Sequence, residues 1–320
     1  MLRREFLFSA ATAAAVVLRP VSGAARLNRK QRVDRALKGE EVDRSPFTFW
    51  HHFGLKTAEA HAERTLEFHK RYRTDIVKVM SDFPYPKPAG KWYELKPLGN
   101  PFPDQLRALE LIRDGLNGDA YFIETIFNPF NVAEKLSSKE EVRRLKDENP
   151  DALLAALDVI TQSEINHAKH AIANGAHGIL LAVANANSKE LSTADYARFN
   201  APFDKRILDA VAGAPLNTLH LHVEREYLDQ FLPFSAPVIN YSLHVTGIPI
   251  AEVRAKFPRQ VIAGGIDEVN YRTLTAANIR AQWESARRAA GKQYILTPGC
   301  SVPNDSSPAE LALLPDTLGA

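Results

Sequence analysis

Short runs rich in β-branched and aromatic residues alternate with long amphipathic stretches along most of this 320-residue chain. The short runs predict strands, and the long stretches predict helices, several of which begin at Ser, Thr or Asp and end at Gly. A regular succession of strand and helix is typical of a parallel sheet. Eight runs are expected to form strands: Pro46–Trp50, Asp75–Met80, Tyr121–Ile126, Gly178–Val183, Asn217–His222, Pro237–Tyr241, Gln260–Gly264 and Tyr294–Thr297.

These eight strands predict a single-domain (β/α)8 barrel of the α/β class, a TIM barrel, over residues 31–320. The alternative is an open doubly wound sheet, but no GxGxxG motif follows the first expected strand, which removes the main support for dinucleotide binding. In a barrel of this kind the active site lies at the C-terminal ends of the strands. Ligand-type residues gather there, as in WHH after the first run, LHLH in the fifth and PGC after the eighth. This pattern favours an enzyme.

Residues 1–30 are expected to form an export leader and no part of the fold. Arg3 and Arg4 precede an apolar run over residues 6–18, and small residues at 22–24 offer a cleavage site. The order RREFL is similar to a twin-arginine signal, so we expect the mature protein in the periplasm; the alternative is a frayed N-terminal helix. Cleavage removes three basic residues and one acidic residue, which leaves the mature chain near neutral. With no basic run either, we expect a small-molecule substrate, no nucleic-acid partner and no membrane contact after cleavage.

Two histidines share one face of the fifth expected strand. A strand alternates its faces with period two, so His220 and His222 point the same way, roughly 6.6 Å apart along the chain. Imidazoles so placed can share a metal ion, line a substrate pocket or lie in the core with their nitrogens hydrogen-bonded. Cys300 is the sole cysteine, which excludes an intrachain disulfide and leaves either an inert or a functional thiol.

Four stretches resemble the uroporphyrinogen decarboxylase superfamily, which also holds cobalamin- and coenzyme-M-dependent methyltransferases. They are RVDRALKGEEVDRSPF, DIVKVMSDFPYP, GGID and YILTPGCSVPNDSSPAEL, and the resemblance runs from Arg32 to Leu311. It implies a (β/α)8 barrel with its site at the C-terminal ends of the strands. Members of the family often dimerise, so the resemblance also implies a homodimer.

In the methyltransferase branch a His-x-Cys on the fifth strand and a cysteine after the eighth hold zinc, which activates a thiol for methyl transfer. The resemblance therefore implies that His220, His222 and Cys300 bind zinc, with His222 standing where a cysteine is usual. Two imidazoles and a thiolate form an adequate set, because catalytic zinc uses three protein ligands and keeps a fourth position open. The alternative is a polar pocket in which the histidines bind substrate and Cys300 has no metal.

In the decarboxylase branch an aspartate after the second strand meets the pyrrole nitrogens, and Asp82 of SDF matches it. A carboxylate there can stabilise a cationic intermediate as carbon dioxide leaves, without any cofactor; the alternative is an Asp that caps the turn before Pro84. The branch also has an arginine after the first strand to bind substrate carboxylates, whereas this chain has His51 and His52. It further has a tyrosine in the third-strand loop, and NPFNVAEKL has none. Both departures count against a porphyrinogen substrate.

Further polar residues at the strand ends are expected to bind the substrate, although turns favour asparagine in any case. Histidines of the helical stretches, His61 and His167 among them, are expected to be surface or packing residues. The expected substrate-binding residues are His51, His52, Asn185, Asn240 and His244.

Three functions are consistent with these observations. The first is zinc-dependent methyl transfer, or a related lyase reaction, on a small non-porphyrin substrate. The second is decarboxylation of a porphyrinogen or another polycarboxylate through Asp82. The third is a periplasmic protein that binds a ligand without catalysis.

Overall fold

The computed structural model describes residues 26–320, so the predicted leader lies almost entirely outside the described residues. No helix within that part of the chain combines the length and the apolar character needed to cross a bilayer. The elements, in chain order, are α1 (Arg29–Lys38), α2 (Ala58–Tyr72), β1 (Ile76–Val79), α3 (Pro103–Leu116), β2 (Tyr121–Phe127), α4 (Pro129–Leu136), α5 (Lys139–Glu148), α6 (Pro150–Ala173), β3 (Ile179–Ala186), α7 (Thr193–Phe199), α8 (Ala201–Ala210), β4 (Thr218–Val223), η1 (Arg225–Phe231), β5 (Val238–Tyr241), α9 (Leu243–Thr246), α10 (Ile250–Lys256), β6 (Val261–Ile266), η2 (Tyr271–Thr273), α11 (Ala276–Ala290), β7 (Tyr294–Pro298) and α12 (Pro308–Leu318).

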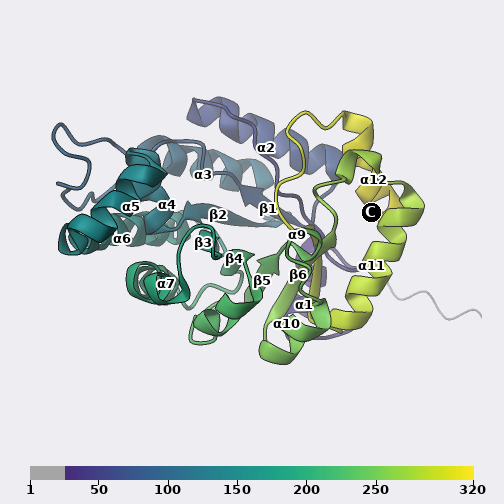
Figure 1. Ribbon diagram of the computed structural model, residues 1–320. Helices are drawn as coiled ribbons and strands as arrows, with labels where there is room; N and C mark the ends of the chain where they lie inside the picture. The colour runs from purple at the N-terminus through teal and green to yellow at the C-terminus, as the bar shows by residue number, and fades with distance from the viewer. Residues whose placement is uncertain (1–25) are drawn as a thin grey trace, which may run out of the picture.

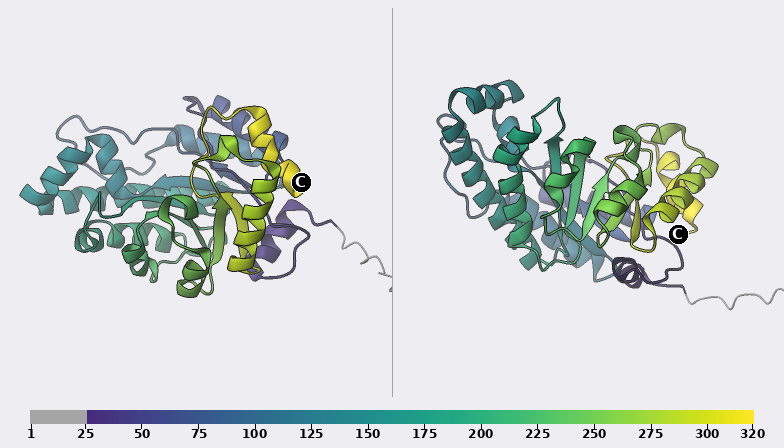
Figure 2. Two further views of the ribbon diagram at one scale, coloured as in Figure 1. Left: turned by 45° about the vertical axis from the view of Figure 1, so that its right-hand side comes forward. Right: turned by 60° about the horizontal axis from the view of Figure 1, so that its bottom comes forward.

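Seven of the eight predicted strands form one all-parallel sheet in the order β1-β2-β3-β4-β5-β6-β7. The sheet curls, and the helices cover its outer side (Figure 1; Figure 2). Each strand pairs with the next along the chain, because the intervening helix returns the chain to the same end of the sheet. The predicted α/β class is confirmed, and the curled parallel sheet is TIM-barrel-like, but the described residues form seven regular strands and not the complete (β/α)8 barrel that was predicted.

The first expected strand, Pro46–Trp50, differs from the prediction. It forms a single bridge, between Phe47 and Leu296 of β7, in place of a regular strand. On the β7 side the backbone N–H of Thr48 donates to the carbonyl of Leu296 at 3.2 Å, and the N–H of Leu296 donates to the carbonyl of Pro46 at 2.8 Å. On the β1 side Asp75 N donates to Phe47 O at 2.9 Å, but a side chain makes the next bond, from the Thr48 hydroxyl to the Ile76 carbonyl at 2.7 Å. Because side chains replace part of the ladder, the segment bonds to both neighbours without becoming an eighth regular strand.

A buried carboxylate holds this segment against β1. Asp75 is fully buried and accepts hydrogen bonds from Arg32 at 2.6 Å and from Arg44 at 2.5 Å. It also accepts from the backbone N–H of Phe47 at 3.0 Å. Two arginines and one backbone N–H thus compensate the charge that burial would otherwise make costly.

Apolar side chains fill the interior at the N-terminal half of the sheet. One buried cluster joins Ile76, Ile123, Leu180, Val238 and Ile295, which come from five different strands, and helix α1 adds a further member to it. Inward-facing apolar residues of this kind form the packed layers of a TIM-type interior. This packing fills the interior at the N-terminal end of the sheet, so the space for a binding site lies at the C-terminal ends of the strands.

The buried ion pairs generate a stability prediction. Asp75→Ala leaves the guanidinium groups of Arg32 and Arg44 without their shared partner, so we expect the free energy of unfolding to fall by about 3–5 kcal/mol. Urea unfolding at neutral pH measures the change. The matched control is Asp316→Ala, which removes an exposed pair with Arg73 and is expected to cost less than about 1 kcal/mol. Equal losses of unfolding free energy in the two variants would show that the buried contacts of Asp75 contribute no more to stability than an exposed ion pair.

Candidate metal centre

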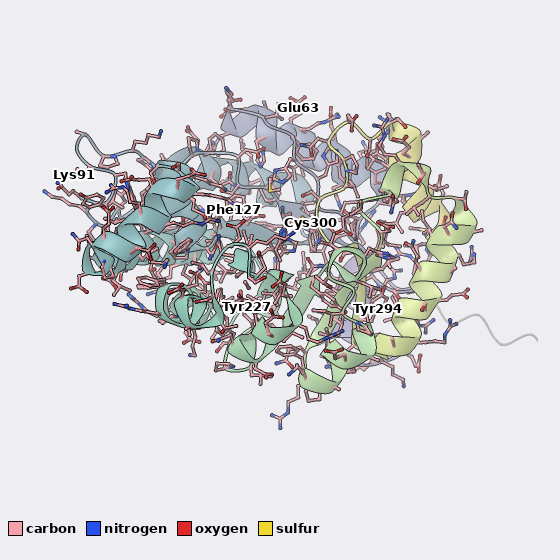
Figure 3. The ribbon with its side chains drawn as sticks, in the orientation of Figure 1. Glu63, Lys91, Phe127, Tyr227, Tyr294 and Cys300 are labelled. Carbon is pink, nitrogen blue, oxygen red and sulfur yellow. The ribbon has the colours of Figure 1, made fainter. Side chains whose placement is uncertain are left out.

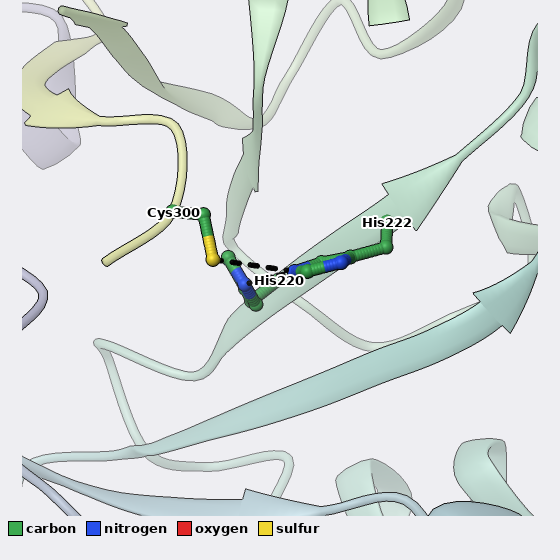
Figure 4. Close-up of side chains that lie close together, drawn as sticks. All are labelled: His220, His222 and Cys300. Atoms are coloured by element: carbon green, nitrogen blue, oxygen red, sulfur yellow. Dashed lines mark hydrogen bonds between the residues drawn. The ribbon is translucent and has the colours of Figure 1, made fainter. Parts of the chain in front are cut away.

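Three side chains from two distant parts of the chain meet at the C-terminal end of the sheet. His220 and His222 lie on β4, and Cys300 lies just beyond the end of β7. The Nε2 atoms of the two histidines are 3.2 Å apart, and Sγ of Cys300 is 3.3 Å from Nε2 of His222 (Figure 4). A ligand atom of each residue lies within 4.8 Å of the other two. The predicted convergence of the histidine pair and the only thiol is therefore present.

A glycine fixes where Cys300 lies. A Cβ atom at Gly299 would lie 2.4 Å from Cα of Ser242, so no larger residue fits between β7 and the segment after β5. The backbone N–H of Gly299 donates to Oε2 of Glu268 at 3.1 Å and to the carbonyl of Ile266 at 3.3 Å. These contacts hold the turn that directs the thiol toward β4.

Asn240 on β5 orients His220 from behind. Its Oδ1 contacts Nδ1 of His220, while its amide Nδ2 donates to the carbonyl of Ala263 at 3.0 Å and to Oγ1 of Thr297 at 3.1 Å. Because these two acceptors fix the orientation of the amide, Oδ1 can only accept, and Nδ1 of His220 carries the proton. In the neutral form of His220 the lone pair of Nε2 then points toward His222 and Cys300, which is the tautomer that a metal-binding histidine needs. Without a metal, Nε2 can instead take up a proton and donate it to the thiolate.

The two histidines change the chemistry of the thiol. Burial alone would raise the pKa of Cys300, but hydrogen bonds and positive charge from His220 and His222 outweigh it and lower the pKa to about 4. The hydrogen bond to Cys300 raises the pKa of His222 in turn. The thiol is therefore a thiolate at neutral pH, which is the form that binds metals.

The donor set fits a zinc ion. Bond lengths of about 2.0–2.1 Å to nitrogen and 2.3 Å to sulfur imply ligand separations of about 3.3 Å between nitrogens and 3.5 Å between nitrogen and sulfur in a tetrahedron. The observed 3.2 Å and 3.3 Å are close to these values. His222 is exposed, so one side of the cluster faces open space, as a catalytic site with a free fourth position requires.

A cavity of about 170 Å³ lies in front of the cluster and is walled in part by Trp50, Phe127 and Leu180. Cys300 and Phe127, labelled in Figure 3, both line this cavity and are partly buried. Lys78 of β1 also lines it, a residue that the sequence analysis did not single out. Burial lowers the pKa of Lys78 to about 8, although the negative charges of Cys300 and Asp82 oppose the shift. A lysine within the apolar run DIVKVM was the available signal, because a strand interior rarely holds a charge without a reason.

Asp82 lies away from this cluster. Its carboxylate accepts from the backbone N–H of Gly54 at 3.2 Å and lies 3.4 Å from Nδ1 of His61 and 3.9 Å from Nδ1 of His52. Burial opposes ionisation of Asp82, but the adjacent imidazoles of His52 and His61 outweigh it and hold the pKa of the carboxyl far below its usual value. His61 is fully buried and is the helix α2 partner of this carboxylate. Asp82 thus ties the loop after residue 50 to α2.

The predicted substrate-binding residues occupy different surroundings. His52 lines the cavity of the cluster, whereas His51 packs against Phe53 and Phe68, with ring centroids 5.3 Å apart in each case. Asn240 lies behind His220 as described above. The remaining two have partners of their own: the Asn185 amide donates to both carboxylate oxygens of Glu134, and His244 lies 3.7 Å from Oδ2 of Asp267. Of these five predicted substrate-binding residues, His52 is the one that lines this cavity. Contact of any of the five with a substrate remains a prediction.

Comparisons with known proteins bear on the family of the chain. A family model described as uroporphyrinogen decarboxylase (URO-D) matches residues 86–319. Among curated proteins, uroporphyrinogen decarboxylase 2, chloroplastic, of Oryza sativa subsp. japonica is 29% identical over 111 residues. This match covers 33% of the chain and 28% of the rice protein, so the chain spans less than a third of that relative.

Two solved structures are similar to this chain over most of its length. A methyltransferase from Methanosarcina mazei has a TM-score of 0.74 at 16% identity, covering 92% of this chain and 99% of that one. A B12-independent methionine synthase from Shewanella sp. W3-18-1 has a TM-score of 0.61 at 12% identity, covering 86% of this chain and 92% of that one. At such identities the likeness shows a shared fold.

The thiolate generates a prediction that needs no metal. In metal-free protein the alkylation rate of Cys300 by iodoacetamide should stay flat between about pH 6 and pH 9, because a thiol with a pKa of about 4 is already ionised. In the His220→Ala/His222→Ala double variant the rate should rise with pH, because without the histidines burial leaves the thiol pKa at or above the ordinary value of about 8.5. Mass spectrometry reads out the single cysteine directly. A wild-type rate that climbs through pH 8 would contradict the predicted thiolate.

Proposed function

Since the chain belongs to the uroporphyrinogen decarboxylase family, we propose that it is a zinc-dependent enzyme of that family, acting by methyl transfer or related chemistry on a small non-porphyrin substrate. The observation that carries the proposal is the cluster of His220, His222 and Cys300. Its atoms lie at separations that suit a tetrahedral ion, and its open side faces a cavity. The likeness to the Methanosarcina mazei methyltransferase supports the reaction class.

In this proposal His220, His222 and Cys300 hold the ion. Zinc, when bound, supplies Lewis acidity that lowers the pKa of a thiol or water placed at its fourth position. Asn240 keeps the proton of His220 on Nδ1, so that Nε2 remains free to bind. The wall of the small cavity is largely apolar, and an environment of this kind strengthens electrostatic interactions with the substrate.

The size of the cavity is also relevant to the substrate. About 170 Å³ accommodates a molecule of a few heavy atoms and no tetrapyrrole. The sequence also has His51 and His52 at the position where the family resemblance implies an arginine in the decarboxylase branch. Both features favour a small substrate.

Decarboxylation through Asp82 is the second candidate, favoured by the match to the rice decarboxylase. Against it, the carboxylate of Asp82 already accepts a hydrogen bond from Gly54 and lies 3.4 Å from His61 and 3.9 Å from His52. A turnover assay with uroporphyrinogen decides between the two. Formation of coproporphyrinogen that is lost in Asp82→Asn would favour decarboxylation over our proposal.

Metal content tests the proposal directly. Protein grown with zinc should contain about one zinc ion per chain by elemental analysis, and His222→Ala and Cys300→Ser should each lose most of it, because two remaining ligands bind weakly. The matched control is His244→Ala, a histidine at a neighbouring strand end whose partner is Asp267. This variant should keep its zinc. Wild-type protein that binds no divalent transition metal would refute the proposal.

The hydrogen bond behind His220 generates a separate prediction. Asn240→Leu removes the acceptor for Nδ1 and should weaken zinc affinity about 10–100-fold. Competition with a chromogenic chelator at fixed pH measures the affinity. Asn185→Leu is the control, because Asn185 contacts Glu134 and no member of the cluster. If the two variants bind zinc alike, Asn240 does not position His220.

A further inference from the structure

A second cavity, of about 220 Å³, lies beside the first and shares Phe127 with it. It opens between the segment after β1, the end of β2 and helices α4 and α6. Aromatic side chains form much of its wall, namely Phe83, Tyr85, Phe102 and Phe127. The proposed zinc chemistry makes no use of this space.

Glu164 of α6 lines this cavity, yet its carboxylate has no partner. The residue is 2% exposed, and its Oε2 atom is buried without a hydrogen bond to any described residue. Two neighbours on the same helix have partners: Ser163 accepts from Tyr85 at 2.8 Å, and Nε2 of His167 lies 3.0 Å from Glu124, although Nδ1 of His167 has none. A buried carboxylate without a compensating donor is costly, so the missing partner of Glu164 calls for an explanation.

Lys135 of α4 provides the opposite charge on the same cavity. The residue is exposed, and its ammonium group lies 2.9 Å from the centroid of the Phe127 ring. It forms no ion pair with Glu164, although both line one cavity. The cavity therefore has the carboxyl group of Glu164 at its buried side, the ammonium group of Lys135 at its exposed side and aromatic rings in its wall. Asp82 and Lys87 line it as well.

We propose that this second cavity binds a small zwitterion, with its ammonium end inward against Glu164 and the aromatic wall and its carboxylate outward against Lys135. An inward ammonium group supplies the donors that Glu164 lacks, and aromatic faces add cation–π attraction. An outward carboxylate meets the exposed cation. The inference rests on this cavity alone and does not depend on a metal at Cys300.

A titration signature follows from the surroundings of Glu164. Burial, reinforced by the charge of Glu124 on β2 and opposed by that of Lys135, raises the pKa of Glu164 to about 8. Asp82 lines the same cavity and adds a further negative charge. At pH 7 the free carboxyl is mainly protonated, and an ammonium group placed against it lowers its pKa. Binding should therefore release a proton from Glu164.

Isothermal titration calorimetry of the full chain tests this. The probes are glycine, β-alanine and 4-aminobutyrate, which separate the two charges by increasing lengths, together with ethylammonium and propionate as the two halves of such a molecule. We expect the best amino acid to bind at least tenfold more tightly than either half. Its binding heat at pH 7 should depend on the ionisation enthalpy of the buffer, as proton release requires.

Variants separate the two ends of the site. Glu164→Gln should weaken the best amino acid at least tenfold and abolish the buffer dependence, without loss of stability, because the carboxyl that it replaces has no hydrogen-bond partner. Lys135→Met should weaken the amino acid and leave ethylammonium unchanged, while Lys139→Met, an exposed lysine paired with Glu190, should change nothing. Propionate or ethylammonium binding as tightly as every amino acid, no binding at all, or unchanged binding in Glu164→Gln would each overturn the proposal.

Discussion

The carboxylate of Asp75 stands between Arg32 and Arg44, and this buried arrangement supports much of the rest of the structure. It holds the segment that begins at Pro46 between β1 and β7, whose edges would otherwise stay unpaired. With this segment in place the sheet keeps its curl, and the ends of β4 and β7 face one interior. A flatter sheet would separate His222 from Cys300, because two further strands lie between them in the sheet.

The cluster at the C-terminal end depends on polar contacts that fix each ligand before any ion binds. Asn240 sets the tautomer of His220, and Gly299 permits the close approach to Ser242 that directs Cys300 inward. Such preorganisation reduces the entropy that a binding event must otherwise overcome. The thiolate is stabilised by the adjacent imidazoles, so one wall of the first cavity carries a negative charge. Lys78 lies on another wall of the same cavity.

The sequence suggested two kinds of site, a metal centre and a catalytic carboxylate. In the structure they lie at two different cavities. The histidine and cysteine ligands face the first cavity, whereas Asp82 lies at the second, bonded to the loop that contains Gly54. Phe127 belongs to both walls. The second cavity carries its own pair of ionisable side chains, Glu164 and Lys135, which form no ion pair, and is therefore chemically distinct from the first. The C-terminal end of the sheet thus presents two neighbouring binding environments.

The sequence by itself determined the order of seven strands and the common direction of His220 and His222, because hydrophobic runs and a two-residue period are local properties of the chain. It also pointed to Cys300 through its family resemblance and its position after the last strand. Only the tertiary structure decided that the segment at Pro46–Trp50 pairs by a single bridge and that Lys78 lines the same cavity as the thiolate. The same is true of the missing partner of Glu164. Each of these depends on residues far apart in the chain, as in the contact between His222 and Cys300, 78 positions apart. Local pattern carries no information about such contacts; they follow from how the sheet curls and which helix covers which strand.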